Sequence, residues 1–312
     1  MPVNDIIKSV IMKNTSNFQA LILTIATQES ASQNATAVDS VTQFAEVNSH
    51  KLAYRSIGKG EPIILINRFR ANLDDWDPAF LDALAKNYRV ITFNYSGMAS
   101  STGIPSDNIE GTAKDVIALA DALKLEKFTI LGWSIGGFTA QAVTALYPER
   151  VTQAILIGTK PPGKVNHAIE EIFLETAFIN DYTLEHETIL FFEPISDKSR
   201  LAAKSSRERM AARTQGRDVK IEQELWQHYT HVSEDYTKDS ENLREKIINT
   251  TIPLLIISGD HEVCFPPENW FELNRKLETS QMIVMARSGH GPQHQYPELT
   301  ANYIHAFMLQ HQ

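Results

Sequence analysis

Gly132-Trp133-Ser134-Ile135-Gly136-Gly137 is the stretch that decides the fold, because it sets a serine between a strand and a helix. An apolar run, residues 128–131, precedes it, and a helix-like run, residues 138–146, follows it. A turn this tight needs small residues two positions before and after the serine, where Gly132 and Gly136 stand. The following helix aims its positive end at the hydroxyl. The stretch therefore predicts that Ser134 is a nucleophile, with the backbone N–H of Ile135 as an oxyanion donor.

The composition is that of an ordinary globular protein with a net negative charge. The chain has 312 residues, 43% hydrophobic and 21% charged, which suits one or two domains. A formal net charge of −9 without a run of Lys or Arg argues against nucleic acid as a partner. No stretch approaches the about 20 apolar residues of a membrane span. A small molecule is the expected partner, and the sequence does not indicate the oligomeric state.

Metal and cofactor signals are weak in this sequence. Cys264 is the single cysteine, which excludes an intramolecular disulfide and a thiolate metal cluster. The histidines show no pair at metal-ligand spacing, and no glycine-rich phosphate loop of the P-loop type occurs. We therefore expect neither a metal nor a cofactor.

Strands alternate with helices along most of the chain, which is typical of an α/β sheet with helices on both faces. Strands are expected over residues 42–47, 51–56, 62–66, 88–93, 128–131, 151–157, 253–257 and 281–285, and helices over 80–85, 108–125, 138–146, 269–277 and 299–309. The alternation stops at residue 159, and helices are expected instead over 165–178, 184–192, 198–214 and 221–231. So long a connection predicts a helical lid, residues 161–250, inserted in a core of residues 41–160 and 251–312. The alternative is that part of this segment packs on the sheet.

Residues 1–40 read as a weakly ordered leader or as a signal segment. Met12-Lys13 would open a signal peptide, with residues 20–26 as its apolar core and Ala35-Thr36-Ala37 as a small-residue cleavage site. The apolar core is short and its spacer to the cleavage site is long. We therefore expect a cytoplasmic protein, with export to the periplasm as the alternative.

A serine nucleophile needs a base, and the base needs a carboxylate to orient it. His290, in Ser288-Gly289-His290-Gly291-Pro292 after the last strand, is the expected base. His294, four residues later, is the alternative base, but a structural role is favoured for it. Two carboxylates follow the strand of residues 253–257. Glu262 is three residues past a glycine and is the favoured acid, whereas Asp260 beside that glycine suits a turn and remains the alternative.

With these residues the chain resembles the α/β-hydrolase superfamily from about residue 41 to its end. The resemblance rests on the Gly-Trp-Ser-Ile-Gly-Gly turn, the order serine, acid, histidine, and the pattern from Gly259 to Pro266. It implies a mostly parallel eight-stranded sheet, a lid after the sixth strand, and chemistry on esters or related acyl compounds. Two departures are Asn67-Arg68, where the family usually has His-Gly, and a glutamate as the acid. The resemblance also implies that the backbone N–H of Phe69 is the second oxyanion donor.

The leading hypothesis is a serine hydrolase that cleaves an ester, lactone or similar acyl compound through an acyl-enzyme. The serine argues against family members with an aspartate nucleophile, and leaves carbon–carbon bond hydrolases and cofactor-free perhydrolases as alternatives. A non-catalytic ligand-binding protein is the alternative from another class. Trp133 and Trp226 are candidate pocket residues. Arg68 either binds an anionic substrate group or turns outward to pair with Asp74 or Asp75, which is the favoured interpretation.

Overall fold

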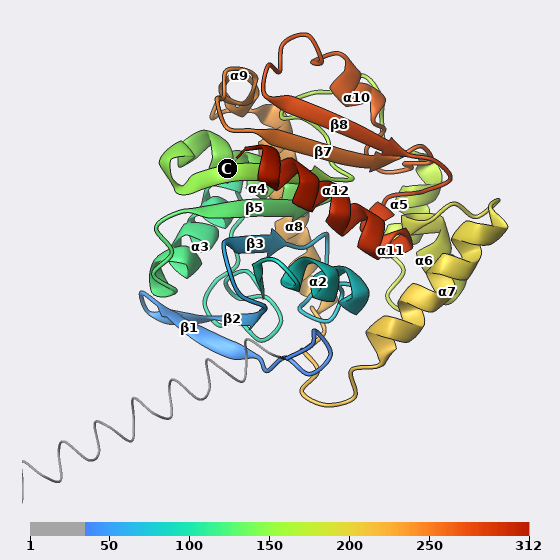
Figure 1. Ribbon diagram of the computed structural model, residues 1–312, viewed down its shortest axis with the longest axis horizontal. Helices are drawn as coiled ribbons and strands as arrows, with labels where there is room; N and C mark the ends of the chain where they lie inside the picture. Colours follow the sequence, from blue (N-terminus) through green and yellow to red (C-terminus); the bar gives the residue numbers. More distant parts are fainter. Residues whose placement is uncertain (1–34, 312) are drawn as a thin grey trace, which may run out of the picture.

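An eight-stranded sheet forms the centre of the computed structural model, which describes residues 35–311 (Figure 1). The order across the sheet is β1-β2-β4-β3-β5-β6-β7-β8. The strands are β1 (Gln43–Val47), β2 (His50–Ile57), β3 (Pro62–Ile66), β4 (Arg89–Phe93), β5 (Phe128–Trp133), β6 (Val151–Ile157), β7 (Leu254–Gly259) and β8 (Ser280–Met285). In this sheet β2 pairs antiparallel with both of its neighbours, β1 and β4, and the other neighbouring strands pair in parallel. The predicted mostly parallel sheet of eight strands is confirmed.

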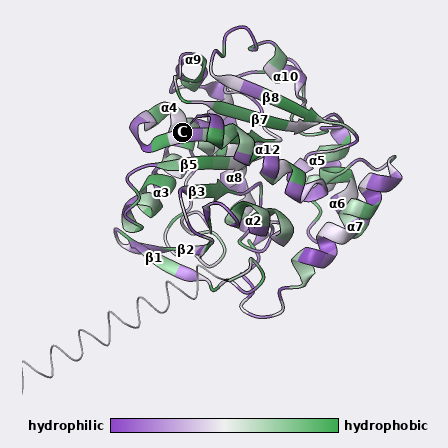
Figure 2. Cartoon of the chain, in the orientation of Figure 1, coloured by the Kyte–Doolittle hydropathy of each residue, from purple (hydrophilic) through white to green (hydrophobic). Residues whose placement is uncertain are grey.

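Helices cover both faces of the sheet, so the central strands are buried on both sides. Alternate residues of β3 enter different cores: Ile64 and Ile66 one, Ile63 and Leu65 the other. The first core packs against α3 (Ile109–Ala122), α4 (Ile135–Leu146), α8 (Trp226–Lys238) and α9 (Leu243–Ile248), and the second against α2 (Pro78–Ala85) and α12 (Pro297–Gln310). Figure 2 shows the hydrophobic colour along β5 and β7 that such double burial requires.

Between β6 and β7 the chain forms only helices and loops, and we call residues 158–253 the helical insertion. It contains α5 (Glu171–Ala177), α6 (Leu184–Phe191), α7 (Asp197–Ala211), α8 and α9. Figure 1 shows α5, α6 and α7 together at one end of the sheet, beyond the tips of the β7 and β8 arrows. The helix expected over residues 165–178 begins only at Glu171. Residues 165–170 form a loop instead, and the Glu170 N–H bonds to the Val263 carbonyl at 2.9 Å.

One expected helix is wrong over most of its length. Instead of residues 269–277, α10 covers Glu268–Phe271 and is followed by turns. The N–H groups of Lys276 and Leu277 both donate to the carbonyl of Leu273, at 2.7 and 3.0 Å, which tightens the chain before β8 starts at Ser280. The short α11 (Pro292–Gln295), just after His290, was not expected.

The folded unit begins before residue 41. The Ala37 N–H donates to Asp82 Oδ1 at 2.7 Å, and Arg213 donates to the Ala37 carbonyl at 2.5 Å and to the Ser40 carbonyl at 2.9 Å. The apolar core of the possible signal peptide, residues 20–26, lies outside the described residues. Within residues 35–311 no helix is both long enough and apolar enough to cross a bilayer.

Candidate active site

Ser134 lies at the apex of a strained turn between β5 and α4. Its φ of 61° and ψ of −126° are unusual for a residue with a side chain. Glycines make the turn possible: a Cβ on Gly132 would collide with the Gly136 carbonyl, and a Cβ on Gly136 would collide with the Ile66 carbonyl. The strand before the serine and the helix after it therefore approach more closely than any larger residue allows. The turn holds the Ser134 side chain at the carboxyl end of the parallel strands.

The loop after β3 lies against the first turn of α4. A Cβ on Gly136 would also lie 2.5 Å from the Asn67 carbonyl oxygen. Asn67 braces this loop from within, because its Oδ1 accepts from the Arg68 N–H at 2.9 Å and its Nδ2 donates to the Asn72 carbonyl at 2.9 Å. The amide occupies the position of the family's usual histidine and supplies loop contacts in its place. Phe69 follows Arg68 in this loop, and Ile135 is the first residue of α4.

His290 and Glu262 form a buried pair. His290 Nδ1 lies 2.8 Å from both carboxylate oxygens of Glu262, and the two residues are 1% and 4% exposed. Glu262 Oε1 also accepts from the N–H groups of Cys264 at 2.8 Å and Phe265 at 3.1 Å, which fixes the carboxylate. Asp260 is exposed and does not reach His290; its Oδ1 accepts from the Ser288 N–H at 3.2 Å and shapes the turn.

Two contacts bring the histidine loop to the serine strand. Trp133, the residue before Ser134, donates from Nε1 to the His290 carbonyl oxygen at 2.7 Å. Gly158, at the end of β6, approaches the pair so closely that a Cβ there would lie 2.7 Å from that same carbonyl oxygen and 3.1 Å from Glu262 Oε2. His290 Nε2 is buried and has no hydrogen-bond partner in the described part of the chain, so it does not bond to Ser134 in this conformation. Catalytic hydrogen bonds are often long when no substrate is bound.

His294 has a structural environment. It is fully enclosed, 4.6 Å from the Trp133 ring centroid, and its Nε2 accepts from the Asp77 N–H at 3.4 Å. Asp77 is itself completely buried and is held by Arg209 and by the Ser206 hydroxyl, both on α7. Burial lowers the pKa of His294 to about 4. This cluster ties α7 of the insertion to the core beside α2.

Aromatic rings surround the histidine and the loop after β3. The ring centroids of Phe173 and Phe265 lie 5.6 and 5.8 Å from that of His290. The Phe69 ring packs against three rings of the helical insertion, at centroid distances of 5.4 Å for Phe178, 5.6 Å for Trp226 and 5.5 Å for Tyr229. Trp226 therefore contacts the loop residue expected to donate to the oxyanion. Trp133 is fully buried beneath the histidine loop.

Arg68 is buried, which corrects the expectation of an outward surface contact. It is only 9% exposed, although its Nη2 does contact one of the expected partners, Asp75 Oδ1, at 3.1 Å. Its Cζ lies 4.5 Å from the Phe191 ring centroid and 5.3 Å from that of Trp133. The side chain is therefore enclosed by packing against the helical insertion, and this packing was not predicted from the sequence.

A cavity of about 420 Å³ opens between the loop after β3 and the helical insertion. Its lining includes Arg68 but neither Trp133 nor Trp226, and it is rich in charge: Arg68, Arg70, Asn72, Asp74, Asp75, Asn180, Asp181, Tyr182, Glu187, Arg207, Met210, Ala211, Arg217, Asp218, Lys220 and Ile221. Most of these charges are paired locally, Glu187 with Arg207 at 2.9 Å and Asp181 with Lys220 at 2.6 Å.

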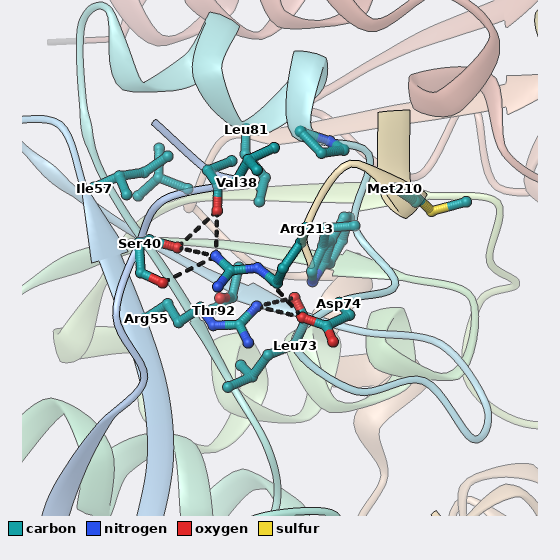
Figure 3. A pocket seen from close by; sticks show the side chains of 14 residues that line it. Val38, Ser40, Arg55, Ile57, Leu73, Asp74, Leu81, Thr92, Met210 and Arg213 are labelled. Atoms are coloured by element: carbon teal, nitrogen blue, oxygen red, sulfur yellow. Dashed lines mark hydrogen bonds and ion pairs between the residues drawn. The ribbon is translucent and has the colours of Figure 1, made fainter. Parts of the chain in front are cut away.

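A smaller cavity of about 20 Å³ is lined in part by a buried cluster of charged side chains, Arg55, Asp74 and Arg213 (Figure 3). Asp74 accepts from Arg55 at 2.6 Å and lies 3.5 Å from Arg213 Nε, while Arg213 also holds the Ser40 carbonyl and hydroxyl. These contacts join the first described residues to the insertion, so this cluster is structural. Residues 35–311 contain no group of three or more His, Cys, Asp or Glu side chains placed to hold a metal ion.

Cys264 takes part in this site through its backbone alone. Its N–H supports Glu262, while its side chain is 2% exposed. Burial, with the Glu262 charge nearby, raises the pKa of the thiol well above its usual value. The thiol therefore stays protonated and is a poor nucleophile at neutral pH.

The likeness to known proteins covers most of the chain. The model of the alpha/beta hydrolase fold family matches residues 61–297. Pimeloyl-[acyl-carrier protein] methyl ester esterase of Aliivibrio salmonicida is 23% identical over 82% of this chain and 95% of its own. A proline iminopeptidase of Pestalotiopsis fici is 25% identical over 80% of this chain and 93% of its own. A solved structure, an alpha/beta hydrolase fold protein from Chitinophaga pinensis, covers 88% of this chain and 99% of its own at 26% identity with a TM-score of 0.79. With this match and this architecture, the chain belongs to the alpha/beta hydrolase fold family and is a hydrolase.

Proposed function

We propose that this hydrolase cleaves a carboxylic ester, lactone or related acyl compound through an acyl-enzyme on Ser134. The observation that carries the proposal is the buried pair of His290 and Glu262, with Nδ1 bound to the carboxylate and Nε2 left without a partner. A carboxylate on Nδ1 fixes the tautomer that leaves Nε2 free to accept a proton. That is the arrangement a serine hydroxyl needs.

In the proposed reaction Ser134 Oγ attacks the acyl carbonyl while His290 Nε2 takes the hydroxyl proton. The C–O bond to the leaving group then breaks, and the same proton passes to the leaving alkoxide. Water, deprotonated by His290, attacks the acyl-enzyme, and the acid is released as Ser134 recovers its proton. The Glu262 carboxylate stabilises the imidazolium that forms.

The negative charge on the carbonyl oxygen is assigned to the backbone N–H groups of Ile135 and Phe69. The N–H of Ile135 belongs to the first turn of α4, where backbone donors have no partner within the helix. Phe69 lies in the braced loop against that turn. Donors of this kind do not depend on the side chains that replace the family's His-Gly at Asn67 and Arg68.

The helical insertion is proposed to be the lid and to shape the acyl pocket. Its rings contact Phe69 and His290, as shown by Trp226 and Phe173. Apolar walls favour a largely apolar acyl group. Two measurements on the wild-type protein test the function: covalent labelling by a fluorophosphonate probe and turnover of a series of p-nitrophenyl esters of increasing acyl length. Labelling at Ser134 with turnover supports the proposal. A protein that binds such esters but shows neither labelling nor turnover is the non-catalytic alternative.

A further inference from the structure

We propose that Arg70 is a positioning residue, which holds the oxyanion-donating backbone of Phe69 by anchoring the loop after β3 to the helical insertion. The inference rests on the proposed function, because Phe69 is an oxyanion donor only there. Arg70 belongs to the core loop, yet the hydrogen bonds that its guanidinium makes within the described part of the chain go to the insertion.

The guanidinium of Arg70 binds one carbonyl at the C-terminal end of α5 and two carbonyls in the loop just after it. Its Nη1 donates to the carbonyls of Ile179 at 2.5 Å and Ala177 at 3.4 Å, and its Nη2 donates to that of Asn180. Carbonyls at a helix end and in the loop after it lack partners within the helix, and an arginine is a suitable donor for them. The side chain therefore fastens the chain just after α5 to the neighbouring core loop.

Two rings of the insertion enclose the same guanidinium. The Arg70 Cζ lies 4.3 Å from the ring centroid of Tyr182 and 4.2 Å from that of Trp226. Trp226 also packs on the ring of Phe69, the preceding residue. Phe69 and Arg70 are thus held by one aromatic wall, so the backbone between them cannot shift without breaking contacts to the insertion.

The backbone of Arg70 indicates that the side chain is kept for these contacts. Its φ of 52° lies in the left-handed region, which costs free energy for a residue with a Cβ and none for glycine. Charge pairing does not explain its presence either. Two carboxylates of the same cavity that interact electrostatically with Arg70 form their ion pairs with other residues, Asp75 with Arg68 and Asp181 with Lys220.

The test compares Arg70→Met with Arg207→Met. Arg207 lines the same cavity, but it contacts Glu187 and the Tyr182 carbonyl within the insertion and no residue of the loop after β3. For each variant we would measure kcat and KM on a short p-nitrophenyl ester, inhibition by a trifluoromethyl ketone that forms a tetrahedral adduct, and Tm. Loss of alignment at one oxyanion donor lowers kcat by roughly 10–100-fold.

In Arg70→Met we expect that fall in kcat, an inhibition constant weakened by a similar factor, and KM within about twofold of wild type. Arg207→Met should lower Tm while kcat and the inhibition constant stay near wild type. Arg70→Lys, which keeps the charge but loses the fork of donors, should fall between Arg70→Met and wild type. Arg70→Gly removes the backbone cost but should be as impaired as Arg70→Met.

The inference would be overturned if Arg207→Met lost as much kcat and as much affinity for the inhibitor as Arg70→Met does. It would also be overturned if the tetrahedral inhibitor bound to Arg70→Met as tightly as to wild type. If Arg70→Met does not fold, the lysine and glycine variants answer the same question, and near-wild-type kcat in Arg70→Gly would overturn it. Failure of wild type to react with the fluorophosphonate probe contradicts the proposed function instead. Normal labelling of wild type with no effect at Arg70 contradicts this inference alone.

Discussion

The indole Nε1 of Trp133 donates a hydrogen bond of 2.7 Å to the carbonyl oxygen of His290, and so joins the residue before the serine to the histidine itself. The bond is completely buried, and it crosses between β5 and the loop after β8. It sets the separation of two chain segments whose side chains have to meet during the reaction. The hydrogen bond therefore constrains the position of the His290 backbone, and through it the position of the imidazole that acts as the base.

Trp133→Phe is expected to lower kcat by roughly tenfold, since the His290 carbonyl loses its donor and the loop can shift. The unsatisfied carbonyl should also cost about 1–3 kcal/mol of unfolding free energy. Trp270→Phe is the matched control, because its Nε1 donates to the Thr159 carbonyl at 2.6 Å and it is equally buried. Urea unfolding and steady-state kinetics on both variants separate the effects. A comparable loss of kcat in Trp270→Phe would speak against positioning by Trp133.

Ser134→Ala and His290→Ala should each lower kcat by on the order of 10⁴–10⁶-fold, and the double variant should be no slower than either single one. The reason is that both side chains act in one proton-coupled attack. Kinetics with a p-nitrophenyl ester and fluorophosphonate labelling provide the measurement, with circular dichroism as the check on folding. Additive losses in the double variant would mean that the two residues act in separate steps.

Glu262→Gln should lower kcat by roughly 10²–10⁴-fold, because the amide cannot stabilise the imidazolium and favours the wrong tautomer. Asp260→Asn is the control in the same loop, and its exposed carboxylate only supports a backbone N–H. We expect this variant to stay within a fewfold of wild type. The reverse order of severity would assign the acid role to Asp260.

Arg68→Met should destabilise the protein by about 1–3 kcal/mol, because it removes a buried cation stacked on two rings and takes away the ion-pair partner of Asp75. We expect kcat/KM to change by the same factor for a neutral ester and for its carboxylate-bearing analogue. Urea unfolding and the two kcat/KM values provide the measurement. A selective loss of tenfold or more on the anionic ester, about 1.4 kcal/mol, would instead make Arg68 a specificity residue.

His294 should make the protein less stable in acid. Burial lowers its pKa from 6.5 to about 4 in the folded state, so the unfolded chain binds the proton more readily. Neutral His294 therefore contributes fully to the free energy of unfolding above pH 6.5. This contribution, which amounts to at most about 3 kcal/mol, is lost as the pH falls toward 4. We expect His294→Gln to show a shallower fall in unfolding free energy across this window. Parallel curves for variant and wild type, measured by urea unfolding at several pH values, would contradict the assignment.

The fold was predictable because its strongest signals are local. The apolar run of β3 and the glycines around Ser134 are features that sequence alone displays, and the structure puts a strand and a tight turn at those places. The failure at residues 269–277 has a local cause as well. Leu273 and Leu277 are spaced as on a helix face, but turns also bury them, at 2% and 4% exposure.

The site was predictable in part for the same reason. Glu262 and His290 follow strand ends, so neighbouring strands of a parallel sheet bring them together. The burial of Arg68 and the contacts of Arg70 depend on Tyr182, Phe191 and Trp226, which belong to the helical insertion. Packing between distant segments of this kind has no periodic signature in the sequence.

Cys264 makes the protein convenient for spectroscopy. As the single thiol of the chain, enclosed and held in its protonated form, it should react slowly with maleimides. Cysteines introduced at exposed positions of the insertion and of the core can then carry fluorophores or spin labels without replacement of the native residue. Distances between such labels would report directly on whether α5, α6 and α7 change position when an acyl compound binds.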